Sequence, residues 1–207
     1  NIADHADVFG GRALVFDGVT DYLDCGRSLC NSFGDNYTGN FSVSLWFNAT
    51  ANTGGLINLG TGFSNDHGEF SIALGNNFTI YMNDAGYYKQ FSAPSTGTWH
   101  HIAVSFDASS ESNLKVFLNG SQVTYSGGGG SFPSAGDLDF NNTKLIIGGF
   151  YSSSFLYNGK IADVKVWDSA ISESDITSQY LKPESTPSQN NLVAWYPMIE
   201  GNPESPQ

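Results

Sequence analysis

Two adjacent histidines, His100 and His101, are the first candidates for acid–base or nucleophilic chemistry. They begin the stretch HHIAVSF, in which every second residue is apolar, the pattern of a half-buried strand. Neighbouring side chains of a strand point to opposite faces, so the two imidazoles cannot act on one substrate. We expect one to be packed and the other exposed. The chain has no Gly-x-Ser-x-Gly elbow, phosphate-binding loop or zinc-ligand spacing, so no catalytic residue is expected.

Carboxylates and amides are plentiful, whereas clusters of thiolates or imidazoles are absent, and oxygen ligands of this kind suit calcium. Asp17 and Asp21 in FDGVTDY and Asp163 in IADV could meet across a sheet at one rim. We expect a Ca²⁺ site there, with turn capping or surface charge as the alternative.

The only two cysteines, Cys25 and Cys30, enclose four residues in CGRSLC. A disulfide closing this loop suits an oxidising compartment, and we expect it to form. Two unpaired thiols at a strand end are the alternative. So short a loop would add little to stability.

Six Asn-x-Ser/Thr acceptors exceed the number expected by chance, although the chain is rich in these residues. Several fall at strand ends or turns, where a glycan fits on the surface. Some should be occupied if the source is a eukaryote or a virus of one, and in a bacterium or phage the motifs carry no meaning. The acceptors are Asn36, Asn40, Asn48, Asn77, Asn119 and Asn141.

Short blocks of period-two alternation dominate the chain and predict strands. Asn119-Gly120 suits a type I′ hairpin turn because both positions accept a positive φ. The expected strands are Ala13–Phe16, Tyr22–Cys25, Phe41–Phe47, Leu56–Leu59, Phe70–Leu74, Phe78–Met82, His100–Phe106, Leu114–Leu118, Lys144–Ile147 and Ile161–Trp167.

One helix is expected, near residues 172–181. Ser172 and Asp175 have capping-box spacing, and Pro183 cannot continue a helix. About ten strands and one late helix predict an all-β protein: a single antiparallel β-sandwich over residues 1–207. Residues 127–130 are expected to form a flexible glycine loop, and residues 182–190 a polar connector.

Charge excludes two classes of partner. The 207 residues include 8 basic and 20 acidic side chains, a formal net charge of −12. Nucleic acid and anionic membrane surfaces both need clustered Lys and Arg, so neither is an expected partner. No apolar run approaches the roughly 18 residues of a membrane helix. No signal peptide is seen either, as expected if Asn1 is a mature terminus. The uncharged polar composition favours an extracellular location.

The order of several segments resembles a known family. They are ALVFDGVTDYLDCG, FSVSLWF, GTWHHIAVSFD, LKVFLNG, KLIIGG and GKIADVKVWDSAISESDITSQYL. The chain resembles, from about Arg12 to about Ile199, the laminin G-like and pentraxin branch of the concanavalin A-like lectin and glucanase superfamily. The resemblance implies two antiparallel sheets in a jelly roll. This fold hosts lectins, hydrolases, adhesion modules and assembly units, so it does not fix the function.

Glycosidases of this superfamily carry Glu-x-Asp-x-x-Glu on one strand, because retaining hydrolysis needs two nearby carboxylates. The only Glu-x-Asp here is Glu173-Ser174-Asp175, in the expected helix cap, and Ser178 stands where the second glutamate would be. The resemblance therefore does not imply a hydrolase.

Pentraxins bind calcium partly through an Asp-Asn pair before a strand, and Asn65 and Asp66 match it here as a second Ca²⁺ candidate. The remaining pentraxin ligands follow the strand that resembles KLIIGG, where residues 149–154 contain no acid. A paired-calcium site and phosphocholine-type binding are therefore not expected.

Glycan binding needs exposed aromatic faces beside amide or carboxylate groups. Tyr87 and Tyr88 are the expected platform, because two adjacent aromatic side chains are hard to bury together. Tyr151, Asn65 and Asp66 lie in further loops that supply rings and polar groups. The alternative is that the rings cover the ends of an aromatic core.

The segment 191–199 is expected to be a β-strand with apolar groups on both faces. Its assembly residues are Leu192, Val193, Ala194, Trp195 and Tyr196. Pentraxins end similarly, with a strand that completes the same subunit, and self-closure is the first expectation. Opening a following domain and donation to a neighbouring copy are the alternatives, and donation would build a filament.

Three functions follow from these observations. The first is a non-enzymatic extracellular recognition module that binds a glycan or a cell-surface polysaccharide, in an adhesin, a lectin-like protein or a virion fibre. The second is the structural subunit of an extracellular filament, and the third is a divergent glycoside hydrolase. We favour the first.

Overall fold

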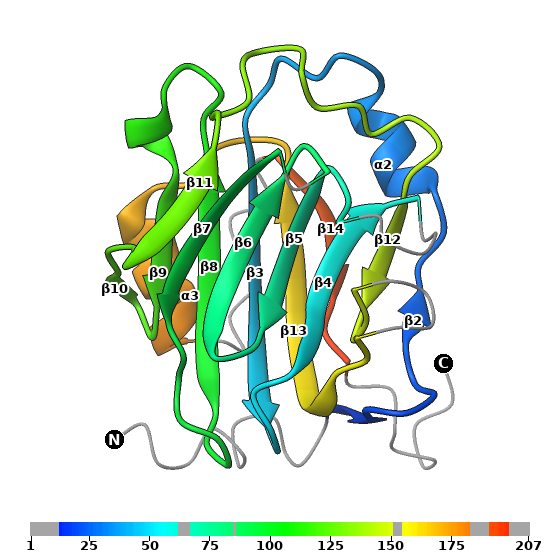
Figure 1. Cartoon of the computed structure of the whole chain (residues 1–207), viewed down its shortest axis with the longest axis vertical. Coiled ribbons are helices and arrows are strands. Elements are labelled where there is room, and N and C mark those ends of the chain that lie inside the picture. The colour runs from blue at the N-terminus through cyan, green and yellow to red at the C-terminus, as the bar shows by residue number, and fades with distance from the viewer. Residues whose placement is uncertain (1–12, 62–66, 85, 151–154, 183–190, 199–207) are drawn as a thin grey trace.

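The structure is a computed structural model that describes residues 13–61, 67–84, 86–150, 155–182 and 191–198. Within these residues, two antiparallel sheets stack face to face, and the main hydrophobic core lies between them (Figure 1). Aromatic rings fill much of this core. Phe41, for example, contacts Phe70 of the opposite sheet edge-on, with ring centroids 5.0 Å apart. The all-β sandwich expected from the sequence is confirmed.

The sheet nearer the viewer in Figure 1, the front sheet, has the strand order β11-β7-β6-β5-β4-β12-β2. Its strands alternate between core-facing apolar residues and outward-facing residues, as the period-two pattern predicts. Their bounds are β2 (Leu23–Asp24), β4 (Gly54–Gly60), β5 (Phe70–Leu74), β6 (Asn77–Met82), β7 (Tyr87–Ser92), β11 (Gly127–Gly130) and β12 (Lys144–Ile147).

The back sheet has the order β1-β13-β3-β8-β9-β10, and β14 also pairs with β13. The N-terminal half of β13 pairs with β1 and its C-terminal half with β14, so both short strands lie along one edge of β13 while β3 lies along the other. The bounds are β1 (Leu14–Asp17), β3 (Phe41–Ala49), β8 (His100–Phe106), β9 (Lys115–Leu118), β10 (Ser121–Gln122), β13 (Asn158–Trp167) and β14 (Leu192–Tyr196).

Helix α3 (Glu173–Leu181) covers the outer face of the back sheet. Its predicted cap is confirmed: the Asp175 N–H donates to Ser172 Oγ at 3.2 Å. Tyr180 stacks on Trp46 of β3, with ring centroids 5.6 Å apart, and Ile176 packs against β8 and β9. The back sheet is therefore closed to solvent on both faces where α3 lies.

This cover corrects the expectation for the two histidines. His100 packs on Phe47 on the core side, and His101 packs against Trp46 on the α3 side. They point to opposite faces as expected, but both are buried, because the helix covers the outer face as well.

Two further elements differ from the expectations. A second helix, α2 (Ser28–Phe33), begins within the CGRSLC segment, and a short 3₁₀ helix, η2 (Glu111–Asn113), precedes β9. The glycine run expected as a flexible loop is the edge strand β11, which pairs with β7. A side chain at Gly130 (φ +82°) would place its Cβ 2.0 Å from the Gly86 carbonyl oxygen, so only glycine permits this approach. The hairpin at Asn119-Gly120 forms as predicted, with φ values of 53° and 76°.

The C-terminal strand β14 closes its own sandwich by pairing with β13. Ala194 and Tyr196 pack against the main core, and Trp195 points to the other side. This is the first of the three arrangements expected for residues 191–199. The polar connector at residues 182–190 lies almost wholly outside the described residues.

A buried polar cluster ties β13, β14 and α3 together. Lys165 Nζ donates to Asp163 Oδ2 at 2.7 Å and to Gln179 Oε1 at 2.6 Å, and Trp195 Nε1 donates to Asp163 Oδ1 at 2.7 Å. The Lys165 side chain is fully buried. Burial lowers the pKa of Lys165 and raises the pKa of Asp163, and the ion pair between them offsets part of both effects.

Candidate functional site

The outer face of the front sheet carries a different pattern from the covered outer face of the back sheet. In β6, Phe78, Ile80 and Met82 enter the core, so the intervening residues point outward. Those outward residues are Asn77, Thr79 and Tyr81, two hydrogen-bonding groups and an aromatic ring. The register places Thr79 opposite Gln90 and Tyr81 opposite Tyr88 of β7. The strand period therefore builds a surface of rings, amides and hydroxyls.

A groove of about 380 Å³ lies on this face. We call it the front groove, and its lining includes His67, Thr79, Tyr81, Gln90 and Phe150. Its size lies in the range of small-molecule sites, which combine apolar surface with a few polar groups.

One end of the front groove is aromatic. The Tyr81 ring lies 4.9 Å from the His67 ring and 5.3 Å from the Phe150 ring, measured between centroids. Phe155, whose side chain is 66% exposed, lies 6.3 Å from Phe150. Tyr88 extends the aromatic surface 6.1 Å beyond Tyr81 and leans against Gly129 of β11, where a Cβ would lie 3.0 Å from its ring. The glycine strand thus leaves room for this ring.

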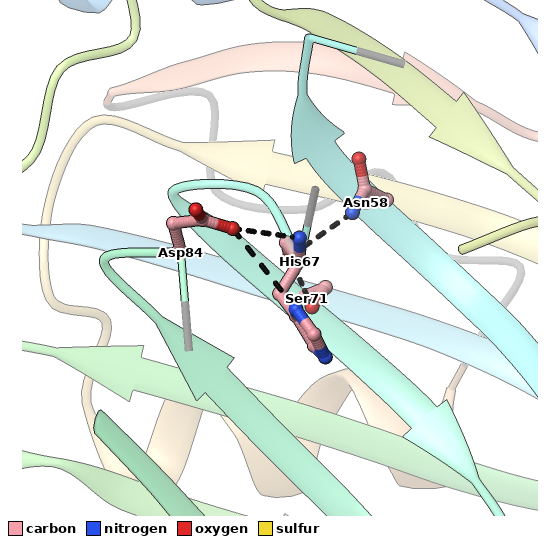
Figure 2. Close-up of polar contacts among 4 residues, drawn as sticks. All are labelled: Asn58, His67, Ser71 and Asp84. Atoms are coloured by element: carbon pink, nitrogen blue, oxygen red, sulfur yellow. Dashed lines mark hydrogen bonds and ion pairs between the residues drawn. The ribbon is translucent and has the colours of Figure 1, made fainter. Parts of the chain in front are cut away.

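Backbone contacts hold His67 in place at the aromatic end (Figure 2). Asn58 Nδ2 and Ser71 Oγ both donate to the His67 carbonyl oxygen, at 3.1 and 2.8 Å. The His67 N–H donates to Asp84 Oδ1 at 3.0 Å, and His67 Nδ1 lies 4.0 Å from the same oxygen. Three separate strands or turns therefore fix the backbone of His67, and its ring stays beside Tyr81.

The other end of the groove is polar, and the half-buried Asn77 and Gln90 line it. Within the described parts of the chain, neither side-chain amide makes a hydrogen bond to another residue. Such groups present both donors and acceptors toward the groove. They are therefore available to a ligand rich in hydroxyl groups.

None of the described residues that line the front groove is Asp or Glu, so these residues supply neither of the two carboxylates used in glycoside hydrolysis. Glu173 and Asp175, the one Glu-x-Asp of the sequence, lie in the first turn of α3, on the outer side of the other sheet. The groove can hold a ligand by stacking and hydrogen bonding.

The expected aromatic platform is corrected by one residue. Tyr87 faces inward and is buried, and its Oη donates to Glu111 Oε1 at 3.1 Å. Burial, together with Glu111, raises the pKa of Tyr87. Tyr88 faces outward as expected. Tyr151, Asn65 and Asp66 lie outside the described residues.

The expected calcium rim does not form. Asp17 and Asp21 cap their own turn: Asp17 Oδ1 accepts from the N–H groups of Val19 and Thr20 at 2.7 and 2.8 Å, and these bonds hold the pKa of Asp17 down at about 2. Asp163 is instead paired with Lys165 in the buried cluster. Across the described segments, no group of three or more His, Cys, Asp or Glu residues is arranged to hold a metal ion. The second candidate pair, Asn65 and Asp66, stays a prediction.

The expected disulfide is also not formed, since Cys25 and Cys30 are both free thiols. Cys30 points into the core from α2, where its thiol forms a hydrogen bond with the Thr143 side chain. The Cys25 thiol forms a hydrogen bond with the Tyr196 side chain of β14. Burial raises the pKa of each thiol to about 11. The unexpected helix therefore directs the two sulfur atoms to different partners.

The six glycosylation acceptors differ in exposure. Asn36 and Asn141 are exposed, whereas Asn40, Asn48, Asn77 and Asn119 are half-buried. Asn119 is the least suited to carry a glycan, because its amide donates to His100 Nδ1 at 3.0 Å and accepts from the His101 N–H at 2.9 Å. Occupancy at the other positions stays a prediction.

Sequence reasoning named the loops near the groove but missed Thr79, Tyr81 and Gln90. The alternation of β6 carried the signal for two of them, because Thr79 and Tyr81 share the polar face of a strand that was correctly expected. Which of the two outer sheet faces stays open depends on where α3 packs, and no local pattern reveals that.

Comparisons with known proteins agree with this fold. A search of curated proteins finds the rat protein "Sushi, von Willebrand factor type A, EGF and pentraxin domain-containing protein 1", 27% identical over 157 residues. The match covers 70% of this chain and spans only 4% of the length of that relative.

None of the helices among the described residues is both long enough and apolar enough to span a membrane.

Solved structures with the same fold share little sequence with this chain. The carbohydrate-binding module CBM40 of a Ruminococcus gnavus sialidase, bound to α2,3-sialyllactose, has a TM-score of 0.59 at 14% identity and covers 81% of this chain and 95% of its own. A heptameric SAP-like pentraxin of Limulus polyphemus has a TM-score of 0.52 at 17% identity, with coverage of 76% and 80%.

The matching family model settles the classification. A laminin G model described as the concanavalin A-like lectin/glucanases superfamily matches residues 17–177, more than half of the chain. The resemblance noted in the sequence is confirmed, and the chain belongs to the laminin G branch of the concanavalin A-like lectin/glucanases superfamily.

Proposed function

We propose that this module is a non-enzymatic recognition domain that binds saccharides in the front groove. The observation that carries the proposal is the meeting of Tyr81 and Tyr88 with the unpaired side chains of Asn77 and Gln90 on one open sheet face. Sugar rings present apolar faces that stack on aromatic side chains, and their hydroxyl groups exchange hydrogen bonds with amides and phenols.

The fold neighbours support a binding role and not a particular ligand. One of them is a carbohydrate-binding module in a sialidase, and others are pentraxin or laminin G domains. We place the module outside the cell, on a cell or virion surface, because the chain has six Asn-x-Ser/Thr acceptors and few charged residues. A filament role has less support, because β14 pairs with β13 of its own chain.

The test is a glycan array followed by isothermal titration calorimetry with the best ligand. Tyr81→Ala and Gln90→Ala should each weaken binding roughly tenfold or more, equivalent to about 1.4 kcal/mol per tenfold. Tyr125→Ala is the matched control, because Tyr125 is 56% exposed and lies outside the front groove. It should change affinity less than twofold.

Each titration is run with calcium and again with a chelator, since Asn65 and Asp66 remain calcium candidates. Thermal melts of each variant establish that the fold is retained. The proposal fails if no glycan binds, or if Tyr81→Ala binds the ligand as tightly as the unaltered protein.

A further inference from the structure

None of the described residues that line the front groove is Lys, Arg, Asp or Glu, although the chain as a whole carries a formal net charge of −12. The imidazole among these lining residues is His67: its N–H donates to Asp84 Oδ1, and its Nδ1 lies 4.0 Å from the same oxygen of this 63% exposed side chain. An incoming ligand therefore meets amide, hydroxyl and imidazole groups beside the Asp84 carboxylate.

The few cations of the described chain are held elsewhere. Lys89 is next to Gln90 on β7, but its side chain faces the other way and pairs with Glu111 at 2.7 Å. Lys144 pairs with Asp24 at 2.6 Å, and Lys165 is sealed beneath α3. Four others, none of them in the groove lining, are Arg27, Lys115, Lys160 and Lys182.

The placement of these charged side chains favours neutral saccharides over anionic ones in the front groove. A carboxylate or sulfate that leaves water needs a charged or strongly donating partner, and proteins supply Arg or Lys for this purpose. Against the described lining of the front groove, such a group would lose its hydration without gaining a Lys or Arg partner, and it would also be repelled by the negative charge of the chain. A neutral sugar carries no such penalty, because Tyr81 and Gln90 can both donate to and accept from its hydroxyl groups.

We propose that the front groove takes uncharged saccharides and rejects sialylated, uronic-acid and sulfated glycans. The proposal rests on the saccharide-binding function above and narrows its ligand class. It separates this chain from the sialidase module of similar fold, whose structure holds a sialylated ligand.

The test compares matched pairs of neutral and anionic glycans: asialofetuin with fetuin, dextran with dextran sulfate, and pectic galactan with polygalacturonate. At least one neutral member should bind in a way that Tyr81→Ala weakens, and its charged partner should bind at least tenfold more weakly. The affinity for the neutral ligand should also change little between low and high salt, because screening acts only on charged pairs.

A variant that adds a positive charge tests whether the absence of Lys and Arg from the described groove lining sets this preference. Gln90→Arg introduces a cation into the groove, and Gln122→Arg makes the same change on exposed β10 of the other sheet. Gln90→Arg should shift the ratio of anionic to neutral affinity toward the anionic glycan by roughly tenfold, about the contribution of one charge-assisted hydrogen bond. Gln122→Arg should leave that ratio unchanged.

The outcomes separate the two proposals. Anionic members that bind as tightly as their neutral partners, with Tyr81-dependent affinity, would overturn the neutral-ligand inference and leave saccharide binding intact. The inference is equally overturned if Gln122→Arg shifts the ratio as much as Gln90→Arg does. Binding of none of the six glycans, together with a blank glycan array, would overturn saccharide binding itself.

Discussion

Replacing Lys165 with methionine should destabilise the protein more than any other lysine substitution. Methionine keeps the length and apolar stem of the side chain but removes the ammonium group. The two bonds from Lys165 Nζ, at 2.7 Å to Asp163 and 2.6 Å to Gln179, are then lost. Asp163 remains buried with Trp195 Nε1 as its single remaining side-chain donor.

The magnitude follows from this geometry. Breaking a fully buried ion pair by removing one partner costs about 3–5 kcal/mol, because the other charge is left uncompensated. Lys165→Met and Asp163→Asn should each lose about that much. Asparagine is the right replacement for Asp163, because this residue has a φ of 54° and Asn tolerates that conformation better than an apolar residue.

The double variant Asp163→Asn/Lys165→Met should lose less than the sum of the two single losses. Both charges are then absent, and the main remaining cost is the unpaired Gln179 oxygen, about 1–3 kcal/mol. The coupling between the two sites should therefore amount to several kcal/mol, as a double-mutant cycle measures it.

Urea unfolding, followed by tryptophan fluorescence, gives the four free energies of the cycle. Lys160→Met is the matched control, because Lys160 lies on the same strand β13 but is exposed, and its loss should fall within about 0.5 kcal/mol. A loss of under about 1 kcal/mol for Lys165→Met, or simple additivity in the double variant, would refute the account of the cluster.

Three further predictions concern other parts of the fold. Burial lowers the pKa of His100 from its usual 6.5, so the folded state binds a proton less readily than the unfolded state. Stability should therefore fall as the pH drops below about 6.5, and pH-dependent melts of His100→Gln should show a smaller fall. Gly148→Ala should destabilise by several kcal/mol in urea unfolding, because Gly148 has a φ of 78° and a Cβ there would lie 2.3 Å from the Phe16 ring. The raised pKa of Cys25 and Cys30 predicts slow alkylation by iodoacetamide at pH 8 in the native protein and fast alkylation of two thiols in urea, counted by mass spectrometry; a single disulfide-linked species would contradict the free thiols.

Elements set by local alternation could be predicted from the sequence. The ranges of β5, β8 and β12 agree with their expected bounds, because an apolar side chain enters the core at every second position of each strand. The helix at Ser172 also agrees, since its cap is a local hydrogen bond. These features depend on neighbours in the chain.

Elements set by distant contacts could not be predicted. The helix α2 begins without a side-chain cap, and β11 consists of four glycines whose only structural signal is backbone pairing with β7. The bulge between Ala162 and Lys165 directs Asp163 away from the rim and into the buried cluster. A bulge of one residue reverses the face of a side chain, and the alternation around it gives no sign of this.

The candidate site shows the same division. The outward face of β6 was readable as a strand face, but its partnership with Gln90 required β7, which the alternation did not identify. That this face stays open required knowing that α3 packs on the opposite sheet. The ligand surface is thus a tertiary property built on a local pattern.

The position of β13 has a consequence for how the chain acquires its fold during synthesis. Ser42 of β3 pairs with Trp167, and Leu14 of β1 pairs with Ile161. Both early strands therefore pair with β13, which is translated much later. On the ribosome, one edge of the apolar strand β3 must remain unpaired until most of the polypeptide has been translated. Pairings so distant in sequence make folding slow, and open strand edges attract other nascent chains. We therefore expect β3 to be exposed to pairing with other nascent chains until β13 has been translated.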